Sequence, residues 1–119
     1  DIKGSIRFLE RFWYLAAEKC VLAEPIQFDA AAEEQLIKRM HRAIKAISDD
    51  MGNYKFNTAV AKLMGWQNEL YVAPAGIRPV IWHQIIGTFA ELLSPIAPFV
   101  TEAVWQELLG HSTSIHEQD

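Results

Sequence analysis

The sequence contains a single cysteine, Cys20, among 119 residues, so no disulfide can form within the chain. Apolar residues surround it in the sequence, and burial in such a setting raises the pKa of a thiol and makes it a poor nucleophile. No histidine lies near it in the sequence to act as its base. We therefore expect a buried, reduced thiol without a catalytic role, which is typical of a cytoplasmic protein.

Several patterns that carry chemistry are also missing. None of the four histidines, His41, His83, His111 and His116, follows a glutamate by three residues, so the Glu-x-x-His ligand pair of di-iron helical bundles is absent. The six glycines are dispersed and form no phosphate-binding loop. No apolar run approaches the roughly 20 residues that cross a bilayer. We expect no catalytic site, no metal and no cofactor in this chain, and no membrane partner.

Positive charge is scarce, because 11 lysines and arginines stand against 15 aspartates and glutamates. Binding to nucleic acid needs a cationic surface, so any RNA contact must use local basic rows. Spacings of three and four residues place two such rows on helix faces: Lys3, Arg7 and Arg11, and then Lys38, Arg42 and Lys45. Charged rows are more often solvated helix faces, and Glu34 can pair with Lys38, so both interpretations stay open.

Apolar residues make up half of the sequence and recur at spacings of three and four, which predicts an all-α fold. Proline and glycine positions divide the chain into about five helices in one up-and-down bundle. Asp29 is the expected N-cap of the second helix and Gly110 the cap that ends the fifth. The expected helices cover residues 3–20, 29–52, 55–72, 79–93 and 100–109. Residues 1–110 would form the bundle, and the polar segment 111–119 would lead toward the rest of a longer protein.

Apolar faces predict how the helices pack. The first helix should bury Ile6, Leu9, Trp13 and Ala16, and the third, apolar on most sides, should lie at the centre. Tryptophans at helical spacing are expected in the core rather than stacked on bases. Asn57 and Asn68 are eleven residues apart, almost three turns, and therefore share a side of the third helix. We expect both amides to be buried, to bond neighbouring helices or loops, and to fix the packing register.

Four segments together resemble a known family. Segment 3–13 is similar to a Gly-Ala-x-Arg-Phe-Leu-x-Arg-x-Trp opening, and segment 40–45 to His-Lys-Thr-Ile-Lys. Segment 55–60 resembles Phe-Asn-Thr-Ala-Ile, and the later Asn-Glu-Leu resembles the Asn-x-Leu that follows it. Segment 93–99, together with Glu102 and Trp105, resembles Leu-x-Pro-x-Ala-Pro-His…Glu-x-Trp. All four occur in the helical anticodon-binding domain of class I aminoacyl-tRNA synthetases, and most closely in leucyl-tRNA synthetase. Phe99 in place of histidine and Ala43 in place of threonine depart from that pattern.

This resemblance implies that the domain holds tRNA while a catalytic core of the same polypeptide, absent from this sequence, attaches leucine with ATP and Mg²⁺. It also implies that the basic rows contact the tRNA backbone, which positions the RNA without reading its sequence. The candidate tRNA contacts are Arg7, Arg11, Lys38, Arg42 and Lys45. Alternatives are the equivalent domain of a valyl- or isoleucyl-type enzyme, a synthetase-like protein, or an unrelated helical protein-interaction module, which the acidic balance would suit.

Overall fold

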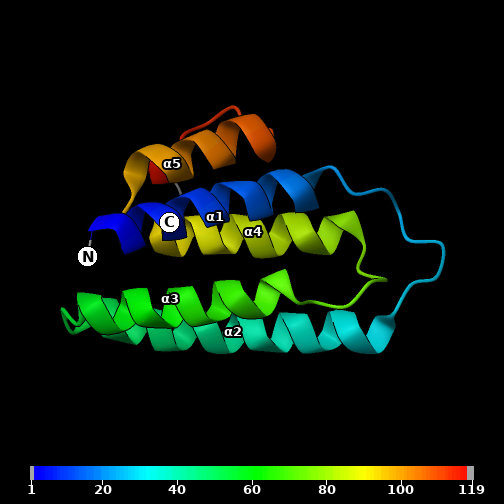
Figure 1. Cartoon of the computed structure of the whole chain (residues 1–119), viewed down its shortest axis with the longest axis horizontal. Helices are drawn as coiled ribbons and strands as arrows, with labels where there is room; N and C mark the ends of the chain where they lie inside the picture. The colour runs from blue at the N-terminus through cyan, green and yellow to red at the C-terminus, as the bar shows by residue number, and fades with distance from the viewer. Residues whose placement is uncertain (1, 118–119) are drawn as a thin grey trace.

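Helices joined by loops make up the fold in the computed structural model, which describes residues 2–117 and contains no strand among them. Their order is α1 (Ile2–Cys20), α2 (Ala30–Gly52), α3 (Phe56–Tyr71), α4 (Pro79–Leu93), α5 (Pro98–Ala103), the π-helical turn η1 (Val104–Leu108) and the 3-10 turn η2 (Ile115–Glu117). Helices α1, α3 and α5 run in one direction and α2 and α4 in the other (Figure 1). The predicted all-α, up-and-down bundle is confirmed.

The ends of the helices follow from local sequence chemistry. The Asp29 carboxylate accepts a hydrogen bond from the Ala32 backbone N–H at 3.0 Å, which caps the start of α2. Pro79 occupies the first turn of α4, where its missing N–H costs nothing. Gly110 adopts a left-handed φ of 79° after η1, as a terminating glycine does. The predicted boundaries of these elements are therefore correct to within about two residues.

Helix α4 forms the centre of the bundle, since it contacts α1, α2 and α5. The ring of Phe89 on α4 stacks on Phe12 of α1 with centroids 4.8 Å apart, and it meets Trp66 of α3 at 5.0 Å. The expectation that α3 would be central is wrong, because Ala61, Gly65 and their neighbours leave one side of α3 exposed. Ala61 and Gly65 are apolar, so the sequence of α3 looks apolar on most sides. They are also small, so burying them would contribute little to stability.

The buried face of α1 also differs from the predicted one. Phe8, Phe12, Leu15 and Ala16 are its buried residues, so only Ala16 of the predicted stripe lies in the core. Ile6 is exposed, and with the half-buried Leu9 and Trp13 it borders an apolar groove of about 250 Å³ beside Val100 of α5. Two adjacent apolar stripes run along α1, and the stripe with Phe8 and Phe12 packs inward, where both rings meet Phe89 of α4.

The segment after α5 returns to the bundle. Leu109 donates its backbone N–H to the Val104 carbonyl at 3.0 Å, the spacing of a π turn, and this turn directs Trp105 inward. The Trp105 ring stacks on His111 with centroids 3.9 Å apart. Residues 111–117 of the polar segment fold back onto the bundle through η2 and bury Ile115, whereas its course toward the rest of a longer protein stays a prediction. Residues 118–119 of that segment lie outside the described part.

Candidate nucleic-acid interface

A cationic groove lies where α2 turns into α3. It has a volume of about 430 Å³ and is bordered by four cationic side chains, two carboxylates and two other residues. The α2 lining follows the three- and four-residue spacing of one helix face, and Lys55 and Lys62 add charge from the turn and from α3. The lining residues are Arg42, Lys45, Ala46, Asp49, Asp50, Asn53, Lys55 and Lys62.

Three of the four cations of this groove are available to a ligand. Lys62 is held by an ion pair of 2.9 Å between its Nζ and Oδ2 of the largely buried Asp50. Arg42, Lys45 and Lys55 are exposed, and none of them makes an ion pair within residues 2–117. Asp49 is the remaining carboxylate of the lining. The groove thus concentrates positive charge locally in a chain whose formal net charge is −4, as phosphate binding requires.

The basic row of α1 lies outside this groove. Arg7 is exposed, whereas Arg11 is half-buried and donates from Nη1 to Oδ1 of Asn68 at 3.0 Å. The Arg11 guanidinium also lies 4.6 Å from the ring centroid of Tyr71, whose hydroxyl donates to the Arg11 carbonyl. Arg11 therefore ties α1 to α3, and this structural role reduces its availability to RNA.

Lys38, the first member of the α2 row, forms the expected pair with Glu34, at 3.2 Å between Nζ and Oε1. Neither residue lines the groove. Arg39, beside it, forms a bidentate pair with Glu69 of α3, with its closest nitrogen and oxygen 2.8 Å apart. The α2 row thus consists of one neutralised cation, Lys38, and two available cations, Arg42 and Lys45, and the neighbouring Arg39 is engaged with α3.

Both predicted structural amides, Asn57 and Asn68, are exposed, so the expectation that they are buried is wrong. They do share one side of α3, but that side faces away from α4, and Asn68 bonds a side chain of α1 rather than backbone. The buried amide of α3 is Gln67, whose Nε2 donates to the Phe8 carbonyl at 3.3 Å. Its signal was present in the sequence, because it follows Leu63 by four residues on the inward stripe.

Sequence reasoning also missed an ion pair that joins the start of α2 to the loop before α4. Glu33 is only 4% exposed. Its carboxylate accepts hydrogen bonds from the Arg78 backbone N–H at 2.9 Å and from the Arg78 guanidinium at 2.8 Å. Arg78 holds the pKa of Glu33 below its ordinary value through these hydrogen bonds. The pair joins α2 to the loop before α4. It lies at the start of α2 and therefore takes no part in the cationic groove, which lies at the other end of that helix.

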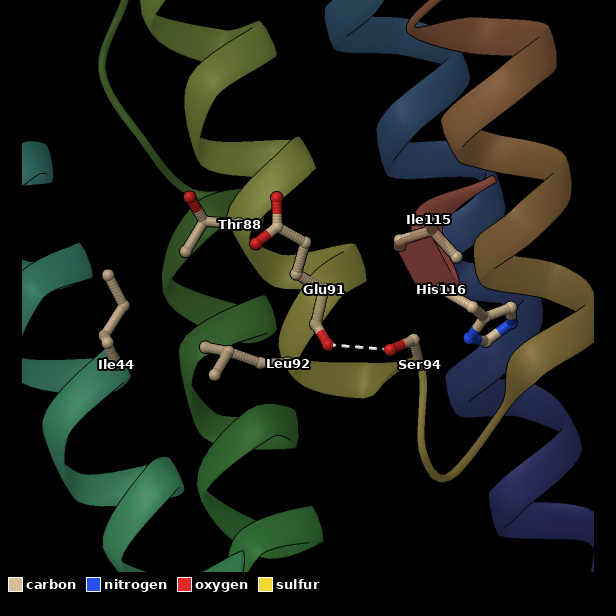
Figure 2. Close-up of a pocket in the computed structure, with 7 residues that line it drawn as sticks. All are labelled: Ile44, Thr88, Glu91, Leu92, Ser94, Ile115 and His116. Atoms are coloured by element: carbon tan, nitrogen blue, oxygen red, sulfur yellow. Dashed lines mark hydrogen bonds between the residues drawn. The ribbon is translucent and has the colours of Figure 1, made fainter. Parts of the chain in front are cut away.

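A second hollow, of about 420 Å³, lies between α2, α4 and η2 (Figure 2). Glu91 and His116 are the ionisable groups among its lining residues, and Ser94 donates from Oγ to the Glu91 carbonyl at 2.9 Å. A lining whose ionisable groups are one carboxylate and one imidazole does not favour a polyanion. Within residues 2–117, no three histidine, cysteine or carboxylate side chains lie close enough together to bind a metal ion. No helix of this part of the chain is long and apolar enough to span a bilayer.

The structure defines the class of the protein as an all-α helical domain with a cationic groove at one end of its bundle. Residues 33–119 match the family described as the anticodon-binding domain of tRNA ligase, and the chain belongs to that family. The leucine–tRNA ligase of Cyanothece sp. is 43% identical over 99% of this chain, and that of Herpetosiphon aurantiacus is 38% identical over 98% of it. In both cases the chain spans 14% of the relative's length. These findings confirm the family resemblance drawn from the four segments.

Proposed function

We propose that this chain is the tRNA-binding helical domain of a leucine–tRNA ligase. Relatives with that name match almost all of the chain, and this observation carries the proposal. The family membership and the cationic groove support tRNA as the ligand. The leucine names of these relatives favour leucine over the valyl- or isoleucyl-type alternative.

In this function the domain positions tRNA for chemistry performed in the rest of the polypeptide. ATP and Mg²⁺ would bind in that catalytic core, where leucine is attached to the tRNA, in the cytoplasm. The glycines of this chain are dispersed along the sequence, and no group of three candidate metal ligands occurs among residues 2–117. Its contribution is binding energy and orientation, which keep the acceptor end of a long RNA near the reacting groups.

Among the five predicted contacts, Arg42 and Lys45 are the strongest candidates, because they border the groove without ion pairs. Lys55, from the turn, joins them. Lys38 and Arg7 remain predicted contacts outside the groove, and Arg11 is engaged with Asn68 and Tyr71. Contacts of this kind to phosphate oxygens fix the register of the RNA rather than its sequence.

A titration of the chain with leucine tRNA at several salt concentrations tests the proposal. We expect Arg42→Ala/Lys45→Ala to weaken binding and to reduce the slope of log K against log salt by about 2, because roughly one counterion is released per phosphate contact. Lys38→Ala should change both quantities less, since Glu34 already neutralises that lysine. An unchanged affinity and salt slope in the double variant would contradict the assignment of the groove.

A further inference from the structure

An exposed aromatic pair lies beside the cationic groove. Tyr54 is 82% exposed and Phe56 is 47% exposed, and their rings meet edge to face with centroids 6.1 Å apart. Tyr54 lies in the turn from α2 to α3 and Phe56 begins α3, at the end of the bundle where Figure 1 also places the start of α1 and the α4–α5 connection. Aromatic rings exposed to this extent leave a large apolar area in water, which a binding partner can cover.

The backbone holds this turn in one shape. Tyr54 has a φ of 59°, in the left-handed region that side chains other than glycine rarely adopt. Its N–H donates to the Met51 carbonyl at 3.2 Å, and the Lys55 N–H donates to the Asp50 carbonyl at 2.7 Å. Asn53 adds a bond from Nδ2 to the Asp49 carbonyl at 2.9 Å. A fixed turn presents the Tyr54 ring with little loss of conformational freedom on binding.

The aromatic pair and the groove are continuous. Asn53 and Lys55, the residues on either side of Tyr54, both line the groove, and Lys55 separates the two aromatic residues in the sequence. Lys55 is thus the cation nearest to the rings along the chain, and Lys45 and Arg42 lie farther back along α2, at about 1.5 Å of helix rise per residue. Aromatic faces interleaved with free cations are the arrangement that proteins use to hold single-stranded nucleic acid.

We propose that this turn and the groove form a subsite for an unpaired nucleotide of the bound tRNA. The base stacks on the Tyr54 ring, Phe56 supports that ring from the side, and phosphates of the same strand contact Lys55 and, farther along α2, Lys45 and Arg42. An unpaired base is required because a base within a duplex has no free face to offer. The inference rests on the proposed tRNA-binding function. It adds that this end of the bundle binds an unpaired part of the tRNA.

The charge of the lining favours a nucleotide over a protein partner. Four cations surround the groove, three of them without an ion pair in the described residues, whereas the centres of protein interfaces are depleted of lysine. Stacking on an aromatic ring tolerates any base, so the subsite would hold its nucleotide without selecting the sequence.

Tyr54→Gly tests the subsite without disturbing the fold, because glycine accepts the left-handed φ at this position. We expect the Kd of the variant chain for leucine tRNA to rise about 5-fold or more, the range measured for loss of one stacked base. The salt slope should stay unchanged, since no charge is removed. Tyr54→Phe keeps the aromatic face and should bind like the parent chain. A fully paired RNA duplex of similar length should bind the parent chain and Tyr54→Gly equally.

The outcomes separate this inference from the function on which it rests. If Tyr54→Gly binds tRNA as tightly as the parent chain while Arg42→Ala/Lys45→Ala binds weakly, the subsite is overturned, the tRNA-binding function stands, and the aromatic turn is a protein-contact surface. If Tyr54→Gly weakens binding to the paired duplex equally, stacking of an unpaired base is overturned. Absence of tRNA binding by the parent chain would contradict both proposals.

Discussion

Glu33 is the most deeply buried carboxylate among residues 2–117, and its oxygens are satisfied by a single partner, Arg78. The pair joins residues 45 positions apart, so it connects the start of α2 to the loop that leads into the central helix. A buried carboxylate without its partner would lose hydrogen bonds to a charged group and retain the cost of desolvation. For both reasons, removing the Glu33–Arg78 pair should measurably lower the free energy of unfolding.

Glu33→Gln should lower the free energy of unfolding by roughly 2 kcal/mol near neutral pH, because it removes charge-assisted hydrogen bonds. The folded chain holds the pKa of Glu33 below its ordinary value of 4.5, so folding favours the ionised form. This contribution is therefore complete above pH 4.5 and is lost as the pH falls through the lower, folded-state pKa. Urea unfolding of both chains across this range would measure the difference.

The exposed neighbour provides the control. Glu34→Gln should change stability little, since its pair with Lys38 lies at the surface. A stability difference between Glu33→Gln and the parent chain that persists undiminished in acid would contradict the assignment of the pKa to the Arg78 pair.

Individual residues of the candidate site were only partly predictable. Arg42 and Lys45 follow from helical spacing on α2, which is a local property. Lys55 and Lys62 were missed because they belong to the turn and to the next helix, and only the α2–α3 packing brings them to the same groove. Arg11 and Arg39 look like equally free cations in the sequence, but partners 57 and 30 residues away engage them. Spacing along a helix does not reveal such partners.

Among the elements, the helices themselves were predictable because proline, glycine and capping residues act locally. The rotation of α1 was not, since its two apolar stripes differ only in which neighbour each meets. The π turn η1 was also missed. It arises where Trp105 is drawn into the core, which is a tertiary demand on a segment with an ordinary helical sequence.

The return of the C-terminal segment depends on Glu102, and its removal should release that segment. The Glu102 carboxylate accepts from Ser114 Oγ at 2.9 Å and from the Ile115 N–H at 3.1 Å. In Glu102→Ala we expect faster hydrogen exchange at the Ile115 amide, with a loss of global stability of only about 1 kcal/mol. Glu107→Ala, at an exposed position on the neighbouring turn, is the control. Unchanged protection of the Ile115 amide would show that the packing of its side chain alone holds the segment.

For the whole molecule, stability is concentrated at Phe89, where rings from α1 and α3 meet the central helix. Phe89→Ala should lower the free energy of unfolding by about 3–5 kcal/mol, the usual cost of a large cavity in a packed core. Denaturant unfolding followed by circular dichroism would measure this loss. Phe99→Ala removes the same side chain where it is 91% exposed and should change stability by no more than about 0.5 kcal/mol. Similar losses in the two variants would contradict the central position of Phe89.

The position of Phe89 late in the chain also has a consequence for biosynthesis. A ribosome releases α1, α2 and α3 before it releases the ring on which Phe12 and Trp66 are to pack. The α2–α3 hairpin can close as it emerges, because its contacts are near in sequence, and α1 can bond α3 through Arg11, but Phe12 meets its stacking partner only 77 residues later. Until α4 follows, the aromatic face of the first helix lacks its Phe89 partner, and a nascent chain arrested at that stage would expose the kind of apolar surface that leads to aggregation.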